Sequence, residues 1–357
     1  MTEDCNPVKT VVFFLSASCG GAERMTITIA RLLDRKEYDV RFVVISREIG
    51  EIKEFIPEDY PLDLVKIRNI YDFTTLRVYW YLKKVRPDYV FCSLHYLNPR
   101  VIQAAKWVGD CKIIVRFNCE VSRVQGLNKR LTKIAYPKAD VIIAQTERMQ
   151  EDLERVYPSI KGVVVTMHNL IDTDTINEKL NASESPYQNE NNKIFVWVGR
   201  YDYVKGADTL VKAFAEACKQ RNDISLYLVG KINAQDQFYQ DVKRLADNSD
   251  FKERIRLVGF QNNPYKWVKN ADCFVLSSVT EGSPNALFEA LYLGVPAVAT
   301  RCTPNIDSII EDDLNGYKVG VGDYAAMSEA MLKALDLKDV KVLYHHSTKE
   351  EFCQLFK

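Results

Sequence analysis

Short apolar runs alternate with helical patterns along the whole chain, which has 357 residues. The apolar runs are rich in Val, Ile and Phe, which is typical of strands buried in a parallel sheet. In the first half, the predicted strands are 10–16, 39–46, 89–93, 112–116, 140–144 and 163–167. In the second half, they are 194–199, 225–230, 256–259, 273–277, 297–300 and 316–319. Helical patterns such as 206–218 and 286–293 fill the intervals. This alternation predicts an α/β fold with parallel sheets.

The length of the chain predicts two domains rather than one core. Residues 181–192 are polar, contain a proline and lack apolar periodicity, so they indicate a linker. We therefore expect doubly wound, Rossmann-like domains at 1–180 and 193–340. The remaining segment, 341–357, is expected to form a C-terminal helix, with packing back on the first domain as one option. Such domains would place a ligand cleft between the carboxyl ends of both sheets.

Composition narrows the classes of protein that need to be considered. Apolar residues make up 47% and charged residues 27%, as in soluble globular proteins. Lys and Arg total 48 and so do Asp and Glu, so the net charge predicts no bulk attraction to nucleic acid. The nine cysteines are scattered without a CxxC pair, which favours a reducing compartment over a disulfide framework or a zinc site.

No stretch approaches the roughly 20 apolar residues of a membrane span. The apolar run at 11–15 is too short for a signal peptide. We therefore expect a cytoplasmic protein, with a position at the inner face of the cell membrane also open.

Two carboxylates, Glu281 and Glu289, bracket a segment that reads as a loop entering a helix. Ser283 is expected to cap this helix and Pro284 to occupy its first position, where a missing N–H costs nothing. Gly294 is placed to end the helix after residue 293.

The amino end of this helix would offer the free N–H groups of Asn285, Ala286 and Leu287, which suit a phosphate. A carboxylate, an anion cradle and a second carboxylate match the sugar, diphosphate and ribose of a nucleotide-sugar. The alternative is ordinary turn-to-helix chemistry with Glu289 in solvent. This segment alone balances the two interpretations evenly.

Two further loops follow predicted strands. Gly20 and Gly21 would let the backbone approach a ligand at a helix start, although a plain tight turn is the better interpretation of this pair alone. The pair does not form GxGxxG, which disfavours a nicotinamide cofactor. Arg200 and Lys205 flank the other loop, where two cations can neutralise a diphosphate leaving group. Taken singly, each is more simply a surface cation.

Together, these motifs resemble the retaining glycosyltransferases of family four, which have the GT-B fold. The resemblance covers nearly the whole chain in the order of the family. Its motifs are Gly20-Gly21-Ala22-Glu23-Arg24, Gly199-Arg200 with Lys205-Gly206, and Glu281 to Glu289 followed by Gly294-Val295-Pro296. Residues 116–118 and 135–140 are similar to members that build bacterial surface polysaccharides or lipid-linked oligosaccharides.

The resemblance implies a role for each matching residue. Arg200 and Lys205 would hold the diphosphate, Glu289 the ribose hydroxyls, and Glu281 the donor sugar near the reacting carbon. Gly21 and the N–H groups after Ser283 would add phosphate contacts. Members transfer the sugar with retention of configuration, and the resemblance implies neither a metal nor another cofactor.

The resemblance further implies that the loop carrying Phe260 lies by the nucleotide base. Many members carry a histidine beside the donor sugar where this chain has Arg116-Phe117-Asn118. Asn118 would replace it, or the role is absent. His95 also follows a predicted strand, so a position facing the cleft is one interpretation, but a structural role is the better interpretation of this residue alone. Lys231 stands where the family often has a second glycine, which leaves the local base contacts open.

We therefore expect transfer of a hexose or N-acetylhexosamine from a nucleotide-diphosphate sugar to a glycan or polyprenyl-linked acceptor. UDP is the commonest nucleotide in the family. The alternatives are a non-catalytic nucleotide-sugar-binding protein and a GT-B sugar-nucleotide epimerase.

The stretches 74–87 and 121–139 lack acidic residues and carry several cations, with aromatic residues beside them in the first stretch. This composition suits an anionic membrane surface. Ordinary amphipathic helices with a solvated basic side remain the simpler alternative.

Overall fold

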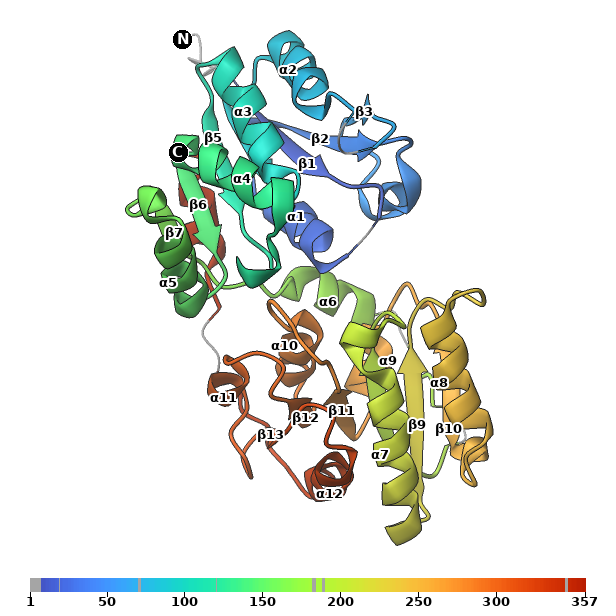
Figure 1. Ribbon diagram of the computed structural model, residues 1–357. Coiled ribbons are helices and arrows are strands. Elements are labelled where there is room, and N and C mark those ends of the chain that lie inside the picture. The colour runs from blue at the N-terminus through green and yellow to red at the C-terminus, as the bar shows by residue number, and fades with distance from the viewer. Residues whose placement is uncertain are drawn as a thin grey trace, which may run out of the picture. The chain divides into compact units, whose positions relative to one another are not determined.

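A computed structural model describes residues 8–18, 20–69, 72–119, 121–181, 184–187, 190–343 and 346–357. Tertiary contacts divide the chain into two compact units (Figure 1). Unit 1 comprises Met1–Leu170 and His346–Lys357, and unit 2 comprises Ile171–His345. Each unit is built on one parallel sheet with helices on both faces, so the predicted α/β, doubly wound fold class is confirmed. The chain passes between the units at 170–171, ahead of the segment expected as the linker.

Unit 1 contains a seven-stranded sheet in the order β3-β2-β1-β4-β5-β6-β7. Its strands are β1 (Lys9–Leu15), β2 (Tyr38–Ser46), β3 (Leu62–Lys66), β4 (Tyr89–Cys92), β5 (Lys112–Arg116), β6 (Val141–Ala144) and β7 (Val164–Thr166). Its helices are α1 (Gly21–Arg31), α2 (Thr74–Val85), α3 (Asn98–Val108), α4 (Gly126–Ala135), α5 (Glu147–Val156) and α13 (Lys349–Gln354), with 3₁₀ turns η1 (Gly50–Phe55), η2 (Val121–Arg123), η3 (Tyr136–Lys138) and η4 (Pro158–Ile160).

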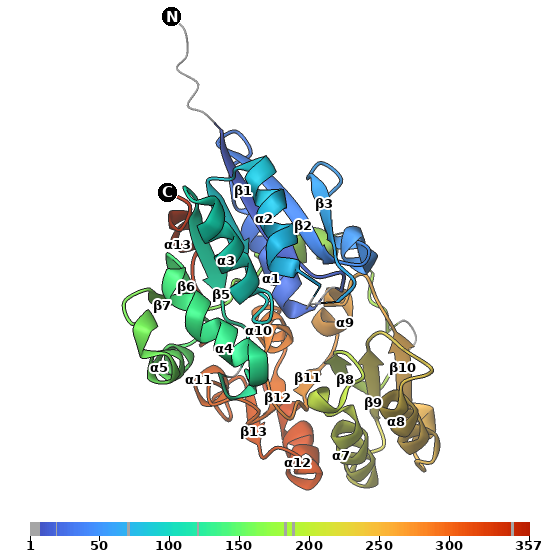
Figure 2. The same ribbon diagram turned by 45° about the horizontal axis from the view of Figure 1, so that its top comes forward.

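Alternate residues of the unit 1 strands point to two separate cores. Helices α2 to α5 bury their apolar faces in one core, and α1, η1 and α13 bury theirs in the other. In Figure 2, α2, α3 and α4 lie side by side over one face of the sheet. Fully buried strands covered on both faces explain the continuous Val, Ile and Phe runs in the sequence.

Unit 2 contains a six-stranded sheet in the order β10-β9-β8-β11-β12-β13. Its strands are β8 (Lys193–Val198), β9 (Ile224–Val229), β10 (Ile255–Gly259), β11 (Cys273–Leu276), β12 (Ala297–Thr300) and β13 (Gly316–Val319). Helices α7 (Ala207–Gln220), α8 (Gln237–Asp247) and α12 (Tyr324–Ala334) cover one face. Helices α6 (Thr173–Asn181), α9 (Tyr265–Lys269), α10 (Asn285–Tyr292) and α11 (Ile306–Ile309) cover the other, and the 3₁₀ turns are η5 (Tyr203–Lys205) and η6 (Lys252–Arg254).

Every strand predicted from the sequence is observed to within a residue or two. β3 was not predicted, because this strand lies at the edge of its sheet and only Val65 of its five residues is buried. An edge strand in contact with solvent lacks the apolar run by which the other strands were recognised.

The strand orders locate the point in each sheet where ligands usually bind. In unit 1, β1 and β4 are neighbours, and the chain continues from β1 to one side of the sheet and from β4 to the other. In unit 2, the chain continues in the same way from the neighbouring strands β8 and β11. In open α/β sheets, ligands bind beyond the carboxyl ends of the strands at such a switch point. The loops after β1 and β4 in unit 1 and after β8 and β11 in unit 2 are therefore the candidates.

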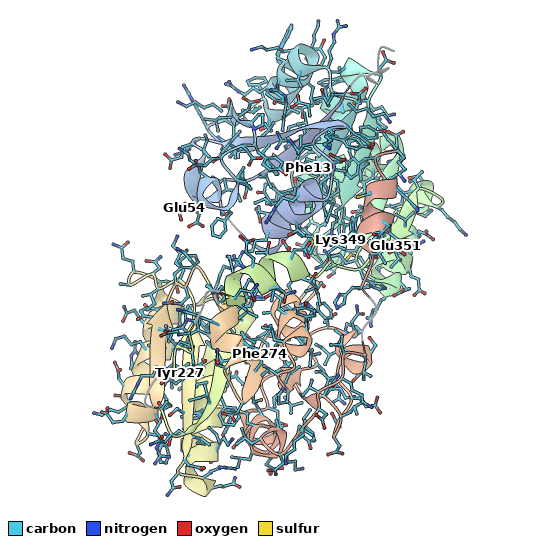
Figure 3. All side chains as sticks on the ribbon, turned by 180° about the vertical axis from the view of Figure 1, so that it is seen from behind. Phe13, Glu54, Tyr227, Phe274, Lys349 and Glu351 are labelled. Carbon is cyan, nitrogen blue, oxygen red and sulfur yellow. The ribbon has the colours of Figure 1, made fainter. Side chains whose placement is uncertain are left out.

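The C-terminal segment packs into unit 1. Phe352 and Phe356 are fully buried in the core that also contains Phe13, which Figure 3 labels. The rings of Phe356 and Phe13 lie 5.8 Å apart, and the hydroxyl of Tyr38 donates to the carbonyl of Phe356 at 2.9 Å. The last residues of the chain are therefore an integral part of the first unit.

Replacing Phe352 with alanine should destabilise unit 1 by about 3–5 kcal/mol, because it leaves a cavity in a closed core. Urea unfolding followed by circular dichroism measures the change. Gln354→Ala, an exposed position on the same helix, serves as the control and should shift stability by less than about 0.5 kcal/mol. Equal midpoints for the two variants would show that α13 does not stabilise unit 1.

Candidate functional site

An ion pair joins the two loops at the switch point of unit 2. Nζ of Lys205 lies 2.6 Å from Oε1 of Glu281. The two side chains are 25% and 10% exposed, so both charges are largely withdrawn from water. A lysine ammonium carries three donors. The pair with Glu281 uses one of them, so Lys205 can also donate to an anion.

Two further contacts hold the two loops together, and a third fixes the loop after β8 internally. The N–H of Val279 donates to the carbonyl of Val204 at 2.7 Å, and the hydroxyl of Ser277 donates to the carbonyl of Lys205 at 2.9 Å. The side chain of Asp202 accepts from the N–H of Lys205 at 3.1 Å and caps η5. The ion pair is therefore built on loops that are fixed independently of it.

Ser278 and Thr300 orient the Glu281 carboxylate. The Ser278 hydroxyl donates to Oε1 of Glu281 at 2.7 Å, and the Thr300 hydroxyl donates to the carbonyl of Ser278 at 2.5 Å. Both residues are fully buried. Burial, and secondarily the Glu281 carboxylate, raises the pKa of the adjacent Cys302 thiol to about 12, so this thiol remains protonated. Ser278 was not predicted as a site residue, because a serine after a strand carries no signal of its own.

Arg200 follows β8, at the carboxyl end of this strand. Its side chain is 71% exposed and lies 3.2 Å from Asp202. An exposed ion pair of this kind contributes little to the stability of the fold. The guanidinium therefore keeps most of its donors available for a planar, charged ligand.

The start of α10 differs from the prediction. The helix begins at Asn285, with Pro284 rather than Ser283 at the cap position and no side-chain cap. The N–H of Asn285 donates to the Ser283 carbonyl and that of Leu287 to the Pro284 carbonyl, both at 3.0 Å. The expectation of three free N–H groups was therefore wrong. The cause is the non-helical backbone of Pro284, whose carbonyl closes the first turn early.

The end of α10 agrees with the prediction. Gly294 follows the cap residue Leu293 with φ of 76°, and its N–H donates to Leu291 at 2.9 Å. Glu289 is half-buried in this helix. Ala286 is also half-buried, whereas Leu287 is fully buried in the core, so only its backbone remains near the loop. Phe260 follows β10 and is 47% exposed.

In unit 1, a buried glutamate organises the loop after β1. Glu23 is 5% exposed and accepts from the Ser16 hydroxyl at 2.5 Å and from the Gly20 N–H at 3.1 Å. A Cβ on Gly20 would lie 3.0 Å from this carboxylate. Gly21 is exposed at the first position of α1. Glu23 belongs to the glycine-rich motif of the sequence, but no role was predicted for it.

His95 and Asn118 come together at the carboxyl ends of β4 and β5. Nδ1 of His95 lies 3.4 Å from Oδ1 of Asn118. Arg116 is 1% exposed, donates to Asn169, and has a buried Nε without a partner. Burial lowers the pKa of this guanidinium to about 10. These facts favour a positioning role for Arg116 over direct contact with a substrate.

Within the described residues, no three His, Cys, Asp or Glu side chains gather closely enough to hold a metal ion. Of the described helices, none combines the length and apolar character needed to cross a membrane.

Two doubly wound units, with a lysine–glutamate pair and an exposed arginine on the loops at the switch point of unit 2, are the arrangement of the GT-B class of nucleotide-sugar enzymes. Family models agree. Residues 19–175 match the model described as Glycosyltransferase Family 4, and residues 178–350 match Glycosyl transferases group 1. The chain therefore belongs to the family-four, group 1 glycosyltransferases.

Curated relatives agree with this assignment, and a solved structure agrees with the fold. The chain is 26% identical to a Campylobacter jejuni N-acetylgalactosaminyltransferase whose named acceptor is a diphospho-undecaprenol glycan, covering 96% of this chain and 94% of the relative. It is 23% identical to an Escherichia coli UDP-Gal:GlcNAc-diphosphoundecaprenol galactosyltransferase, covering 90% and 87%. The fold matches that of Anabaena HepE in complex with UDP, with a TM-score of 0.76, 17% identity and coverage of 92% and 90%.

Replacing Gly206 with alanine tests how closely the two unit 2 loops must approach. Gly206 has φ of 61°, and a Cβ there would lie 2.1 Å from the Ser277 carbonyl oxygen. We expect a lower melting temperature, because the loop bearing Lys205 must move. Gly322→Ala is the matched control, because Gly322 also has a positive φ, 78°, but a Cβ added there would have no atom within 4 Å. It should cost only the roughly 1–2 kcal/mol of a left-handed alanine. Equal losses in both variants would contradict the close approach.

Proposed function

We propose that the protein is a retaining, metal-independent glycosyltransferase that uses a UDP-sugar donor. It moves a hexose or N-acetylhexosamine to a polyprenyl-diphosphate-linked glycan in the synthesis of a cell-surface polysaccharide. The acceptors named for the Campylobacter and Escherichia relatives support this acceptor class. The observation that carries the proposal is the Lys205–Glu281 pair at the switch point of unit 2.

In this proposal, unit 2 binds the donor. Lys205 and Arg200 neutralise the diphosphate, and Glu289 accepts from the ribose hydroxyls. Glu281 accepts from the donor sugar while Ser278 and Lys205 hold its carboxylate in place. Phe260 is exposed and offers a ring face beside the base. A cation pair aimed at the leaving group stabilises the charge that develops as its bond to the sugar breaks.

The reaction needs no nucleophile from the protein. The bond between the anomeric carbon and the diphosphate oxygen breaks, and the acceptor oxygen bonds to the same face of the sugar. The released phosphate oxygen takes the proton of the acceptor hydroxyl, so the charges balance. Unit 1 is the acceptor-side domain in this proposal, and the Gly20–Gly21 turn and the His95–Asn118 pair are its candidate substrate contacts. We place this activity at the inner face of the cell membrane, where a polyprenyl-linked acceptor is reached.

Arg200→Ala should weaken UDP binding roughly tenfold or more, because a charge-assisted contact to the diphosphate is lost. Calorimetry with UDP and with uridine separates this effect from base contacts, since uridine affinity should not change. Arg221→Ala removes an arginine paired with Asp223 elsewhere in unit 2 and serves as the control. Undiminished UDP affinity in Arg200→Ala would remove this residue from the diphosphate site.

Glu281→Gln should retain UDP affinity to within a few fold, because glutamine can still accept from Lys205 and Ser278. Transfer should fall roughly 100-fold, because a charge beside the reacting carbon is removed. A radiolabel transfer assay with a polyprenyl-diphosphate-linked acceptor measures turnover. Glu253→Gln, an exposed change in η6, should leave it intact. Unchanged turnover in Glu281→Gln would refute the role given to this carboxylate.

A further inference from the structure

Three neighbouring helices on one face of unit 1 contain no acidic residue. These are α2, α3 and α4, which pack side by side in chain order over the sheet (Figures 1 and 2). The whole chain has equal numbers of acidic and basic residues, so the exclusion of acids here is local. We call these three helices the acid-free layer.

The acid-free layer presents cations to solvent. Its exposed basic residues are Arg77, Lys83, Lys84, Lys106, Lys129, Arg130 and Lys133. Asp72 and Asp140 lie just outside the layer and approach Arg77 and Lys106 at 3.5 and 3.8 Å. Both basic partners are more than 40% exposed, so these pairs are weak and leave the layer strongly positive.

Large apolar side chains are exposed among these cations. Their exposed fractions are 74% for Phe73, 44% for Leu76, 58% for Trp80, 55% for Trp107, 50% for Leu127 and 60% for Ile134. The ring of Tyr79 in α2 also contacts α3, because its centroid lies 5.3 Å from the ring centroid of Trp80 in α2 and 6.1 Å from that of Trp107 in α3. The Lys83 ammonium lies 5.1 Å over the Trp80 ring. Aromatic and aliphatic groups therefore alternate with cations on one surface.

The next helix on the same face has the opposite character. α5 carries Glu147, Glu151, Asp152 and Glu154 against two arginines. It contributes to the same core as α2 to α4. The change of charge between neighbouring helices shows that the acid-free layer is a bounded surface rather than a general property of unit 1.

We propose that the acid-free layer docks the protein on an anionic lipid bilayer. Tryptophans partition to the membrane interface, and lysine and arginine are attracted to anionic headgroups while their stems cover apolar surface. Nucleic acid would use the cations but would gain nothing from exposed Leu127 and Ile134, so the lipid surface fits more of what is exposed. The inference rests on the proposed function in one respect, because a polyprenyl-linked acceptor lies in such a bilayer.

The test compares binding of the full chain to vesicles of phosphatidylcholine alone and with added phosphatidylglycerol. Co-sedimentation should show binding only with the anionic lipid, and binding should weaken as salt is raised. Combining Lys84→Gln, Lys129→Gln and Lys133→Gln should reduce partitioning by up to roughly 100-fold, at about fivefold for each cation. The matched control combines Lys36→Gln, Lys53→Gln and Lys66→Gln, three exposed lysines outside the layer, and should bind as wild type.

Tryptophan fluorescence provides a second readout. The chain has four tryptophans, and of these Trp80 and Trp107 are exposed, whereas Trp197 is 1% exposed. Anionic vesicles should shift the emission to the blue, and replacing Trp80 and Trp107 with phenylalanine should abolish the shift. UDP affinity in solution should be the same in wild type and in both lysine triples.

The outcomes separate the two proposals. Wild type that binds UDP and transfers sugar but ignores anionic vesicles overturns the membrane surface and leaves the proposed function intact. Wild type that binds anionic vesicles but does not bind UDP overturns the proposed function and leaves the membrane surface intact. Equal losses in the two triple variants, or tighter binding to a single-stranded RNA than to vesicles with no change in fluorescence, also overturn the proposal.

Discussion

The candidate site depends on one ion pair, between Lys205 and Glu281. Placing either charge alone in this mostly buried position would be costly, and the two charges together are tolerated because each satisfies the other. The pair also joins the loop after β8 to the loop after β11, and therefore lies at the switch point of the sheet. A lysine held in this way presents its remaining donors in a fixed direction. Such preorganisation is what stabilisation of a leaving diphosphate requires.

The same device recurs in unit 1 with a different partner. Glu23 is buried and satisfied by a serine hydroxyl and a backbone N–H instead of a cation. In both units, a carboxylate fixes the loop that follows a central strand of the sheet. The serines and the threonine around these carboxylates are consequently positioning residues whose effect on a ligand is indirect.

Sequence patterns were sufficient for the fold because parallel strands covered on both faces must be apolar throughout. β3 escaped notice because an edge strand does not obey that rule. Arg200, Lys205 and Glu281 could be named as candidates because they stand together on loops after predicted strands, and because their spacing resembles a family. The supporting contacts could not be predicted. Ser278 and the burial of Arg116 depend on which loops meet in three dimensions, and the start of α10 depends on the backbone angles of Pro284.

A crystal structure with bound UDP tests the central claim most directly. Oxygens of the diphosphate should lie about 2.7–2.9 Å from Nζ of Lys205 and from the guanidinium of Arg200, the range of charge-assisted hydrogen bonds. Glu281 should remain bonded to Ser278 in that complex. A diphosphate bound away from the loops after β8 and β11, with Lys205 still paired only to Glu281, would contradict the account.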